Sequence, residues 1–149
     1  MFKHASKAIH GMAFFFILLS SQMAWSAPDA IAGKAKAQVC AACHGEQGVS
    51  SMAGTPHLAA QPQLSIFYQL LQFRDQRRLG GGMEAIAATL SEQDMRDIAA
   101  HYASQPAPPP HTGGDASKIA RGQQIAQQQY CSSCHGAQLQ GQKHVPRLS

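Results

Sequence analysis

The sequence lacks three features that would each indicate a particular class of protein. It has no run of lysine and arginine of the kind found in nucleic-acid-binding proteins, and residues 74–78 form its only basic cluster. No window alternates apolar and polar residues in the way a half-buried strand does. The apolar run at residues 12–19 is too short for a comfortable membrane span. We therefore expect no nucleic-acid partner and a chain without strands.

Cysteine is scarce, and all four cysteines fall in two copies of one pentapeptide. Cys40-Ala41-Ala42-Cys43-His44 recurs as Cys131-Ser132-Ser133-Cys134-His135. Cys-x-x-Cys-His is the attachment signature of c-type haem. Two thiols three positions apart lie on one face of a helical turn, where both can bond to one porphyrin, and the next residue brings an imidazole beneath the iron. The motifs therefore predict two covalently attached haem c groups, with His44 and His135 as the proximal iron ligands.

Three other uses of paired cysteines compete with haem attachment. A thioredoxin-like dithiol has the same four residues but requires a βαβ context and no histidine directly after them. Two such pairs could also supply four thiolates to one zinc ion. Disulfides are a third use in an exported protein. The histidine that follows the second cysteine in both copies favours haem over all three.

The N-terminal region indicates export. Lys3 and Lys7 precede the apolar run at residues 12–19, and small residues follow at Ala24 and Ser26. This is the layout of a secretory signal peptide, which we place at residues 1–26. An uncleaved membrane anchor is the alternative. In bacteria haem is attached to this motif on the outer side of the cytoplasmic membrane, so both signals predict a periplasmic protein.

An internal repeat divides the mature chain. Residues 33–45 match residues 122–136, allowing two extra residues before the second pair of cysteines, and residues 55–58 correspond to residues 145–148. Between the copies, residues 104–114 are rich in proline and cannot continue a helix, which predicts a stiff linker. We expect one domain at residues 27–103 and a partial second domain at residues 115–149.

The first copy is expected to consist of helices alone. One helix should run from near Asp29 into the first motif. The next has apolar residues at helical spacing, and its predicted buried stripe is Leu64, Phe67, Tyr68, Leu71 and Phe73. A last helix begins after Ser91, which can cap it together with Asp94. The predicted buried face of this helix is Met95, Ile98, Ala99 and Tyr102.

These features resemble the class I cytochromes c. The first copy is similar to short bacterial cytochromes with one haem, and the duplication is similar to tandem di-haem cytochromes that supply terminal oxidases. The matching residues are 40–44, 56–61, 68–74 and 83–102. The resemblance implies an all-α fold, a class I cytochrome c haem domain followed by an incomplete second copy. It also implies that the carbonyl of Pro56 accepts a hydrogen bond from His44 and so fixes the imidazole.

The resemblance implies a methionine as the distal iron ligand of the first haem, and Met83 is the candidate. Met83 follows three glycines that let the backbone pass close to a porphyrin. A thioether favours ferrous iron and raises the reduction potential. Met52 and Met95 are its rivals, and any methionine can simply fill a core. We expect His57 in a loop and His101 on a helix surface rather than at the iron.

The second copy departs from the family pattern. No methionine follows His135, and the matching methionine loop and final helix are absent from the sequence given. We expect the chain to be a fragment of a longer di-haem protein. If the gene is short instead, His144 could substitute as the sixth ligand of the second haem.

The predicted function is that of an electron carrier rather than an enzyme. When two axial ligands bind the iron in addition to the porphyrin, no position is left open for a substrate, and no acid/base pair is evident. The expected partners are an upstream electron donor and a membrane-bound respiratory oxidase or reductase. The alternative is a haem enzyme or its electron-entry subunit, such as a di-haem peroxidase; a haem-based gas sensor would need a signalling module, which the sequence does not show. Residues 74–78 form either a solvated helix end or a docking patch.

Overall fold

A computed structural model describes residues 26–109 and 114–148 of the chain. Its helices are α1 (Ala30–Lys36), α2 (Gln38–His44), α3 (Gln63–Arg74), α4 (Met83–Ala88), α5 (Glu92–Ala103), α6 (Ala116–Gln128) and α7 (Ser132–His135). Every regular element in these residues is a helix, which confirms the expected all-α chain. None of the described helices is long and apolar enough to cross a membrane. The predicted signal peptide lies outside the described residues except for Ser26.

The helix expected from Asp29 into the first motif forms as two pieces. Asp29 caps α1, because its carboxylate accepts hydrogen bonds from the N–H groups of Ile31 and Ala32 at 2.8 and 3.1 Å. The structure then interrupts the helix at Ala37, where ψ is −2°. The carbonyl of Ala37 also accepts a long hydrogen bond of 3.5 Å from the hydroxyl of Tyr102. The break therefore lies where α5 contacts the start of the motif helix.

The buried face of α3 differs from the predicted stripe. Phe67 and Phe73 are buried as expected, but Leu64 and Tyr68 are 45% and 46% exposed. Ile66 and Leu70, which the stripe omitted, are buried instead. Apolar residues occur almost all round this helix, so their spacing alone allowed two faces. Packing against α4 and α5 selects the one that is buried.

A single helix was expected after the glycines of residues 80–82, but the structure has two. The short α4 begins at Met83, and Gly81 and Gly82 before it have left-handed φ values of 63° and 87°. The capping of α5 is confirmed: Ser91 Oγ accepts from the N–H of Asp94 at 3.1 Å, and the Asp94 carboxylate accepts from the N–H of Ser91 at 3.1 Å. Its predicted buried face is also confirmed, since each of its four residues is at most 1% exposed (Met95, Ile98, Ala99 and Tyr102).

Helix α1 packs closely against α5 because Gly33 has no side chain. A Cβ atom at Gly33 would lie 2.0 Å from the carbonyl oxygen of Asp97 and 3.0 Å from Cβ of His101. His101 is consequently buried, with 6% of its surface exposed, so the expectation that it lies on a helix surface is wrong. Lys36 fastens the same contact through ion pairs of 2.7 Å to Asp94 and 2.6 Å to Asp97.

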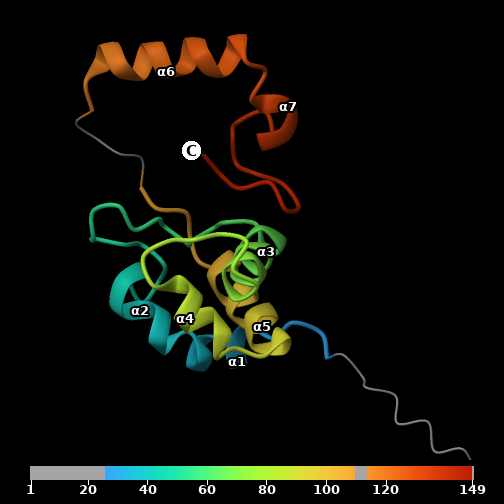
Figure 1. Ribbon diagram of the computed structural model, residues 1–149. Coiled ribbons are helices and arrows are strands. Elements are labelled where there is room, and N and C mark those ends of the chain that lie inside the picture. The colour runs from blue at the N-terminus through green and yellow to red at the C-terminus, as the bar shows by residue number, and fades with distance from the viewer. Residues whose placement is uncertain (1–25, 110–113, 149) are drawn as a thin grey trace, which may run out of the picture.

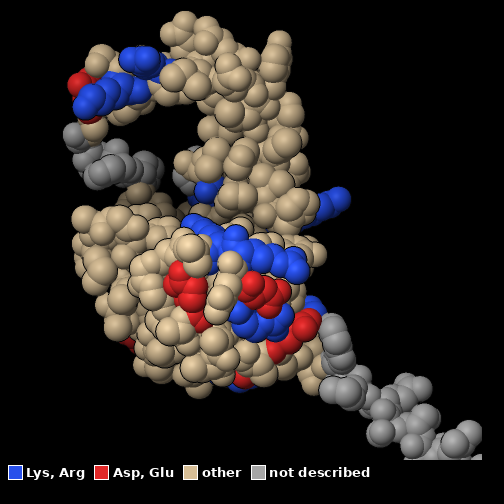
Figure 2. All heavy atoms as spheres, in the orientation of Figure 1, with Lys and Arg blue, Asp and Glu red and all other residues tan. Residues whose placement is uncertain are grey.

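The second copy forms a separate part of the structure. Helix α6 lies apart from helices α1 to α5, while α7 and the loop after it turn back toward α3 (Figure 1). No residue of α6 is buried. Between α5 and α6, residues 104–109 and 114–115 contain no helix. On the face of the first copy shown in Figure 2, Lys and Arg side chains lie directly beside Asp and Glu side chains, so this face has no large area of one sign.

Candidate haem centres

The first motif occupies α2 and the turn that ends it. Cys40 and His44 are one turn apart and each is only 6% exposed, whereas Cys43 lies at the surface. Burial raises the pKa of the Cys40 thiol above its ordinary value. The helix ends at Gly45, whose φ of 80° belongs to the left-handed side that favours glycine. The motif thus presents one buried thiol, one exposed thiol and one buried imidazole from a single short helix.

The imidazole of His44 is held by a backbone carbonyl. Its Nδ1 lies 2.9 Å from the carbonyl oxygen of Pro56. Because a carbonyl can only accept, this contact assigns the proton to Nδ1 and leaves Nε2 with a free lone pair. Nε2 is therefore the nitrogen available to bind a metal.

Two contacts of Ser50 hold the loop that carries Pro56. Its hydroxyl donates to the carbonyl of Cys43 at 2.7 Å, and its N–H donates to Nδ1 of His57 at 2.9 Å. His57 is an exposed loop residue, as expected. The Pro56 carbonyl, which accepts the hydrogen bond from His44, thus lies in a loop that is itself hydrogen-bonded to the motif at Cys43.

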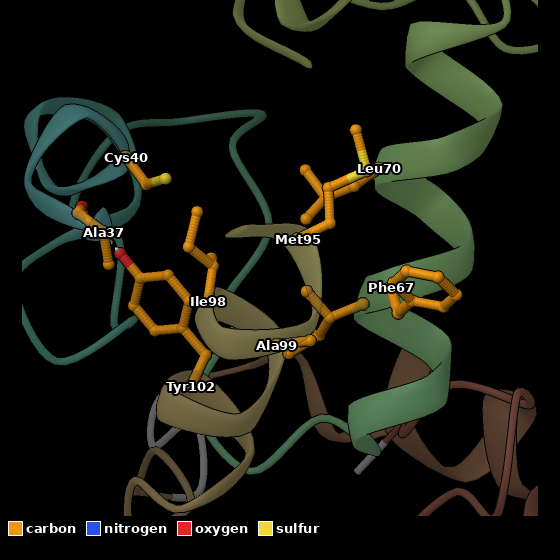
Figure 3. Packing of buried hydrophobic residues seen from close by; sticks show 9 residues of the cluster. Ala37, Cys40, Phe67, Leu70, Met95, Ile98, Ala99 and Tyr102 are labelled. Carbon is orange, nitrogen blue, oxygen red and sulfur yellow. Dashed lines mark hydrogen bonds between the residues drawn. The ribbon is translucent and has the colours of Figure 1, made fainter. Parts of the chain in front are cut away.

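A cluster of buried apolar residues surrounds Cys40. Figure 3 shows the thiol of Cys40 pointing toward the middle of this cluster, on the same side as Ile98 of α5 and opposite Leu70 of α3. The cluster consists of Ala37, Cys40, Ile66, Phe67, Leu70, Met95, Ile98, Ala99 and Tyr102. Leu58, Leu71, Met83 and Leu90 are partly buried and pack against it. The first motif therefore opens onto an apolar interior formed by α3, α4 and α5.

The three candidate methionines lie in different surroundings. Met83 is half-buried at the first position of α4 and packs against the cluster that contains Cys40. Met95 is completely buried within that cluster, and Met52 is 51% exposed on a loop. Met83 therefore lies at the border of the apolar cluster, between the complete burial of Met95 and the exposure of Met52.

The donor atoms of the two motifs do not suit the competing uses of cysteine. All four cysteines are free thiols, so no disulfide forms. In the described residues no three potential ligands among His, Cys, Asp and Glu lie close enough to share a metal ion. A pair of thiols, an imidazole with free Nε2 and an apolar interior instead fit a planar haem.

The second motif has the same local geometry with less cover. His135 Nδ1 lies 2.8 Å from the carbonyl oxygen of Pro146, and the N–H of Gly141 donates to the carbonyl of His135 at 2.7 Å. Cys131 and His135 are only partly buried, and Cys134 is exposed. The residues that could attach a second haem are therefore arranged as in the first copy, without an apolar interior among the described residues.

The two copies meet at a boundary that sequence reasoning did not predict. The carboxamide of Gln61 bonds to the backbone of Arg147 at both ends, with Oε1 2.8 Å from its N–H and Nε2 3.2 Å from its carbonyl oxygen. The ring of His144 lies edge-on to Tyr68 with a centroid distance of 6.1 Å. These contacts join residues far apart in sequence, so no local pattern could have indicated them.

A family model described as "Cytochrome C oxidase, cbb3-type, subunit III" matches residues 26–101. That match covers the first copy, from the residues before Asp29 to the last turns of α5. Its extent agrees with the part of the chain that forms a buried apolar interior.

Relatives that match about four fifths of the chain are named cytochrome c4. The chain is 41% identical over 130 residues to cytochrome c4 of Thiocapsa roseopersicina, covering 81% of this chain and 67% of that protein. It is 37% identical over 118 residues to cytochrome c4 of Pseudomonas aeruginosa, covering 76% of this chain and only 59% of that protein. The crystal structure of reduced recombinant cytochrome c4 from Pseudomonas stutzeri superimposes with a TM-score of 0.70 at 29% identity, covering 83% of this chain and 73% of that chain. The class I cytochrome c fold implied by the sequence is thereby confirmed.

Proposed function

We propose, from the premise that this chain belongs to the cytochrome c4 family of di-haem class I c-type cytochromes, that it is an exported electron carrier with haem c at both motifs. Cys40 and Cys43 would attach the first haem, and Cys131 and Cys134 the second. The single observation that carries the proposal is the pairing of each motif histidine with a proline carbonyl, at 2.9 Å for His44 and 2.8 Å for His135. A dithiol enzyme or a disulfide has no use for such a contact.

The chain's own residues set the conditions for electron transfer at the first site. Haem bound there would supply a one-electron change between ferric and ferrous iron. The carbonyl of Pro56 orients His44, so the imidazole does not have to turn when the charge at the metal changes. The apolar cluster behind Cys40 keeps water away from the site. The thioether of Met83 would act as the distal ligand and favour the reduced state.

The same arrangement favours a carrier over an enzyme. With His44 and Met83 both bound, no position is left for a substrate or for peroxide. The buried residues that cluster with Cys40 are apolar apart from the hydroxyl of Tyr102, which bonds to the carbonyl of Ala37. Fast electron exchange with a partner and negligible peroxidase turnover are therefore expected of the native protein.

The proposed cellular setting follows from the N-terminal sequence and from the family. Residues 1–26 would direct the chain to the periplasm and be removed there. Residues 27–103 would form the first haem domain, residues 104–114 the linker, and residues 115–149 part of a second. The donor delivers electrons in the periplasm, and the acceptor is a membrane-bound respiratory oxidase or reductase. Such redox partners meet through small, transient interfaces.

Haem content tests this proposal directly. Mass spectrometry of protein isolated from the periplasm should give the mass of the chain without residues 1–26 plus two haem groups. Replacing Cys131 and Cys134 by alanine should remove one haem mass, and replacing Cys40 and Cys43 should remove the other. Free thiols or bound zinc at both motifs in the unaltered protein would contradict the proposal.

A further inference from the structure

The peptide group between Pro146 and Arg147 is hydrogen-bonded at both of its ends. Its carbonyl oxygen, on Pro146, accepts from Nδ1 of His135 at 2.8 Å. Its N–H, on Arg147, donates to Oε1 of Gln61 at 2.8 Å. Both atoms belong to one planar, conjugated unit. A single peptide group therefore joins the imidazole of the second motif to a side chain of the first copy.

Backbone hydrogen bonds fix the position of Gln61 on the first copy. Its own N–H donates to the carbonyl of Leu58 at 3.2 Å, and the N–H of Ala60 before it donates to the carbonyl of Tyr102 on α5 at 3.1 Å. Helix α3 begins two residues later, at Gln63. The second end of the carboxamide, Nε2, donates to the carbonyl of Arg147 at 3.2 Å. The position of this carboxamide is thus determined by the core of the first copy.

We propose that Gln61 is a positioning residue through which the first copy tunes the proximal histidine of the second. Hydrogen bonds in a chain polarise one another, so donation from the N–H of Arg147 to Gln61 makes the carbonyl of Pro146 a stronger acceptor. A stronger acceptor on Nδ1 makes the imidazole of His135 more electron-rich. An electron-rich ligand favours ferric iron, so the contact lowers the reduction potential of the second haem. This inference rests on the proposed haem at the second motif.

The first motif has no equivalent of this contact. Its corresponding peptide group joins Pro56 and His57, and within residues 26–109 and 114–148 the N–H of His57 donates to no other group. The carbonyl of Pro56 therefore holds His44 without a second hydrogen bond from the protein on the same peptide group. The tuning is expected to act on the second haem alone, and a substitution at Gln61 should separate the two sites.

The test replaces Gln61 by methionine, which keeps the length of the side chain and removes both hydrogen bonds. Gln72→Met is the matched control, because Gln72 lines the pocket between the copies with Tyr68 and His144 but makes neither of the two hydrogen bonds that Gln61 makes to the backbone of residue 147. In the Gln61→Met variant the potential of the second haem should rise while that of the first stays constant. Exchange of the Arg147 amide proton should accelerate about tenfold, the effect of losing one ordinary hydrogen bond. Neither quantity should change in the control.

Several outcomes would overturn this inference. They are an unchanged second potential, an equal rise at both haems, or unchanged amide exchange at Arg147 in the Gln61→Met variant. Gln61→Leu serves as a second variant, and its result should agree in direction. A chain that matures with haem at the first motif alone would contradict the two-haem proposal and the tuning together. Two bound haems with an unmoved second potential would contradict the tuning only.

Discussion

In the first copy His44 bonds to the carbonyl of Pro56 at 2.9 Å, and in the second His135 bonds to that of Pro146 at 2.8 Å. Around these nearly equal contacts the two copies differ greatly. His44 is 6% exposed and adjoins an apolar cluster, whereas His135 is only partly buried. The comparison teaches that the loop between motif and proline, aided in the second copy by the contact of Gln61 with Arg147, can hold the imidazole without burying it. Burial of the site requires α3, α4 and α5 in addition.

At one loop position, packing against α5 requires glycine in the first copy, whereas the second copy has leucine there. The carbonyl of Gly48 accepts from the N–H of Leu58 at 2.8 Å, and that of Leu139 accepts from the N–H of Leu148 at 2.8 Å. Gly48 and Leu139 are both in the left-handed region, with φ of 76° and 56° respectively. A Cβ at Gly48 would lie 2.8 Å from the ring of Tyr102 on α5. The described residues of the second copy contain no counterpart of α5, so a leucine fits there at the backbone cost of a left-handed residue.

The largest expected effect concerns the distal ligand of the first haem. Met83→Ala should remove the contribution of the first haem to the red charge-transfer band of methionine-bound ferric haem, because the thioether that would bind its iron is lost. The potential of the first haem should fall by on the order of 0.1 V, within the wide range that axial ligands control. Visible spectroscopy and redox titration of the purified protein measure both changes.

Met52→Ala is the control for this ligand assignment. Met52 is 51% exposed on its loop, so its removal should leave the spectrum and both potentials unaltered. If Met83→Ala instead leaves the band in place while Met52→Ala removes it, the assignment of the distal ligand is wrong. If both variants keep the band, the first site has no methionine ligand from either loop.

Two glycines at corresponding places in the repeat sharpen the comparison further. A Cβ at Gly33 would lie 2.0 Å from the carbonyl oxygen of Asp97, whereas a Cβ at Gly122 on α6 would meet no atom within 4 Å. Gly33→Ala should therefore force α1 away from α5 and lower the free energy of unfolding by about 1 to 3 kcal/mol. Gly122→Ala should raise it by about 0.5 to 1 kcal/mol, since alanine is the better helix former.

Denaturant unfolding followed by circular dichroism would measure both glycine substitutions. Each variant serves as the control for the other, because the chemical change is identical and only the surroundings differ. Effects of equal sign would show that α6 is packed against another part of the protein in solution.

Local signals explain which features could be predicted from sequence. The start of the first helix near Asp29 and the cap of α5 at Ser91 depend on residues within a few positions of each other, and both were predicted correctly. The buried face of α3 depended on its neighbours, and two of the five residues in the predicted stripe, Leu64 and Tyr68, are exposed instead. His101 is buried because Gly33, far away in the sequence, allows α1 to approach it. The bond between Gln61 and Arg147 likewise follows from the tertiary structure alone.

The smallest expected effect is electrostatic and belongs to the contact between α1 and α5. Hydrogen bonding from Lys36 holds the pKa of Asp94 below its ordinary value. Burial acts to raise the pKa of Asp97, but hydrogen bonds from Lys36, the N–H of Asp29 and Gln93 outweigh it, and that pKa is lowered too. Asp94 and then Asp97 raise the pKa of Lys36 through their hydrogen bonds. Each group is thus more strongly ionised in the folded state than in the unfolded chain.

The sign of the pH dependence follows from these directions. Lowered carboxyl pKa values add stability that is complete above the unfolded value of 3.8 and is lost as the pH falls through the lower folded values. The raised pKa of Lys36 adds stability that is complete below 10.5 and is lost as the pH rises through its folded value.

Replacing Lys36 by methionine should cost about 1 kcal/mol of the free energy of unfolding at pH 7. That cost should shrink as the pH falls below 3.8 and as it rises above 10.5. Arg74→Met is the matched control, because its partner Asp75 is the next residue and is 36% exposed, whereas the Asp97 partner of Lys36 is only 4% exposed, so almost no change is expected at Arg74. Urea unfolding of the three proteins across the pH range would decide the matter: a cost at Lys36 that stays constant with pH would mean that this residue acts through packing of its aliphatic stem and not through the two carboxylates.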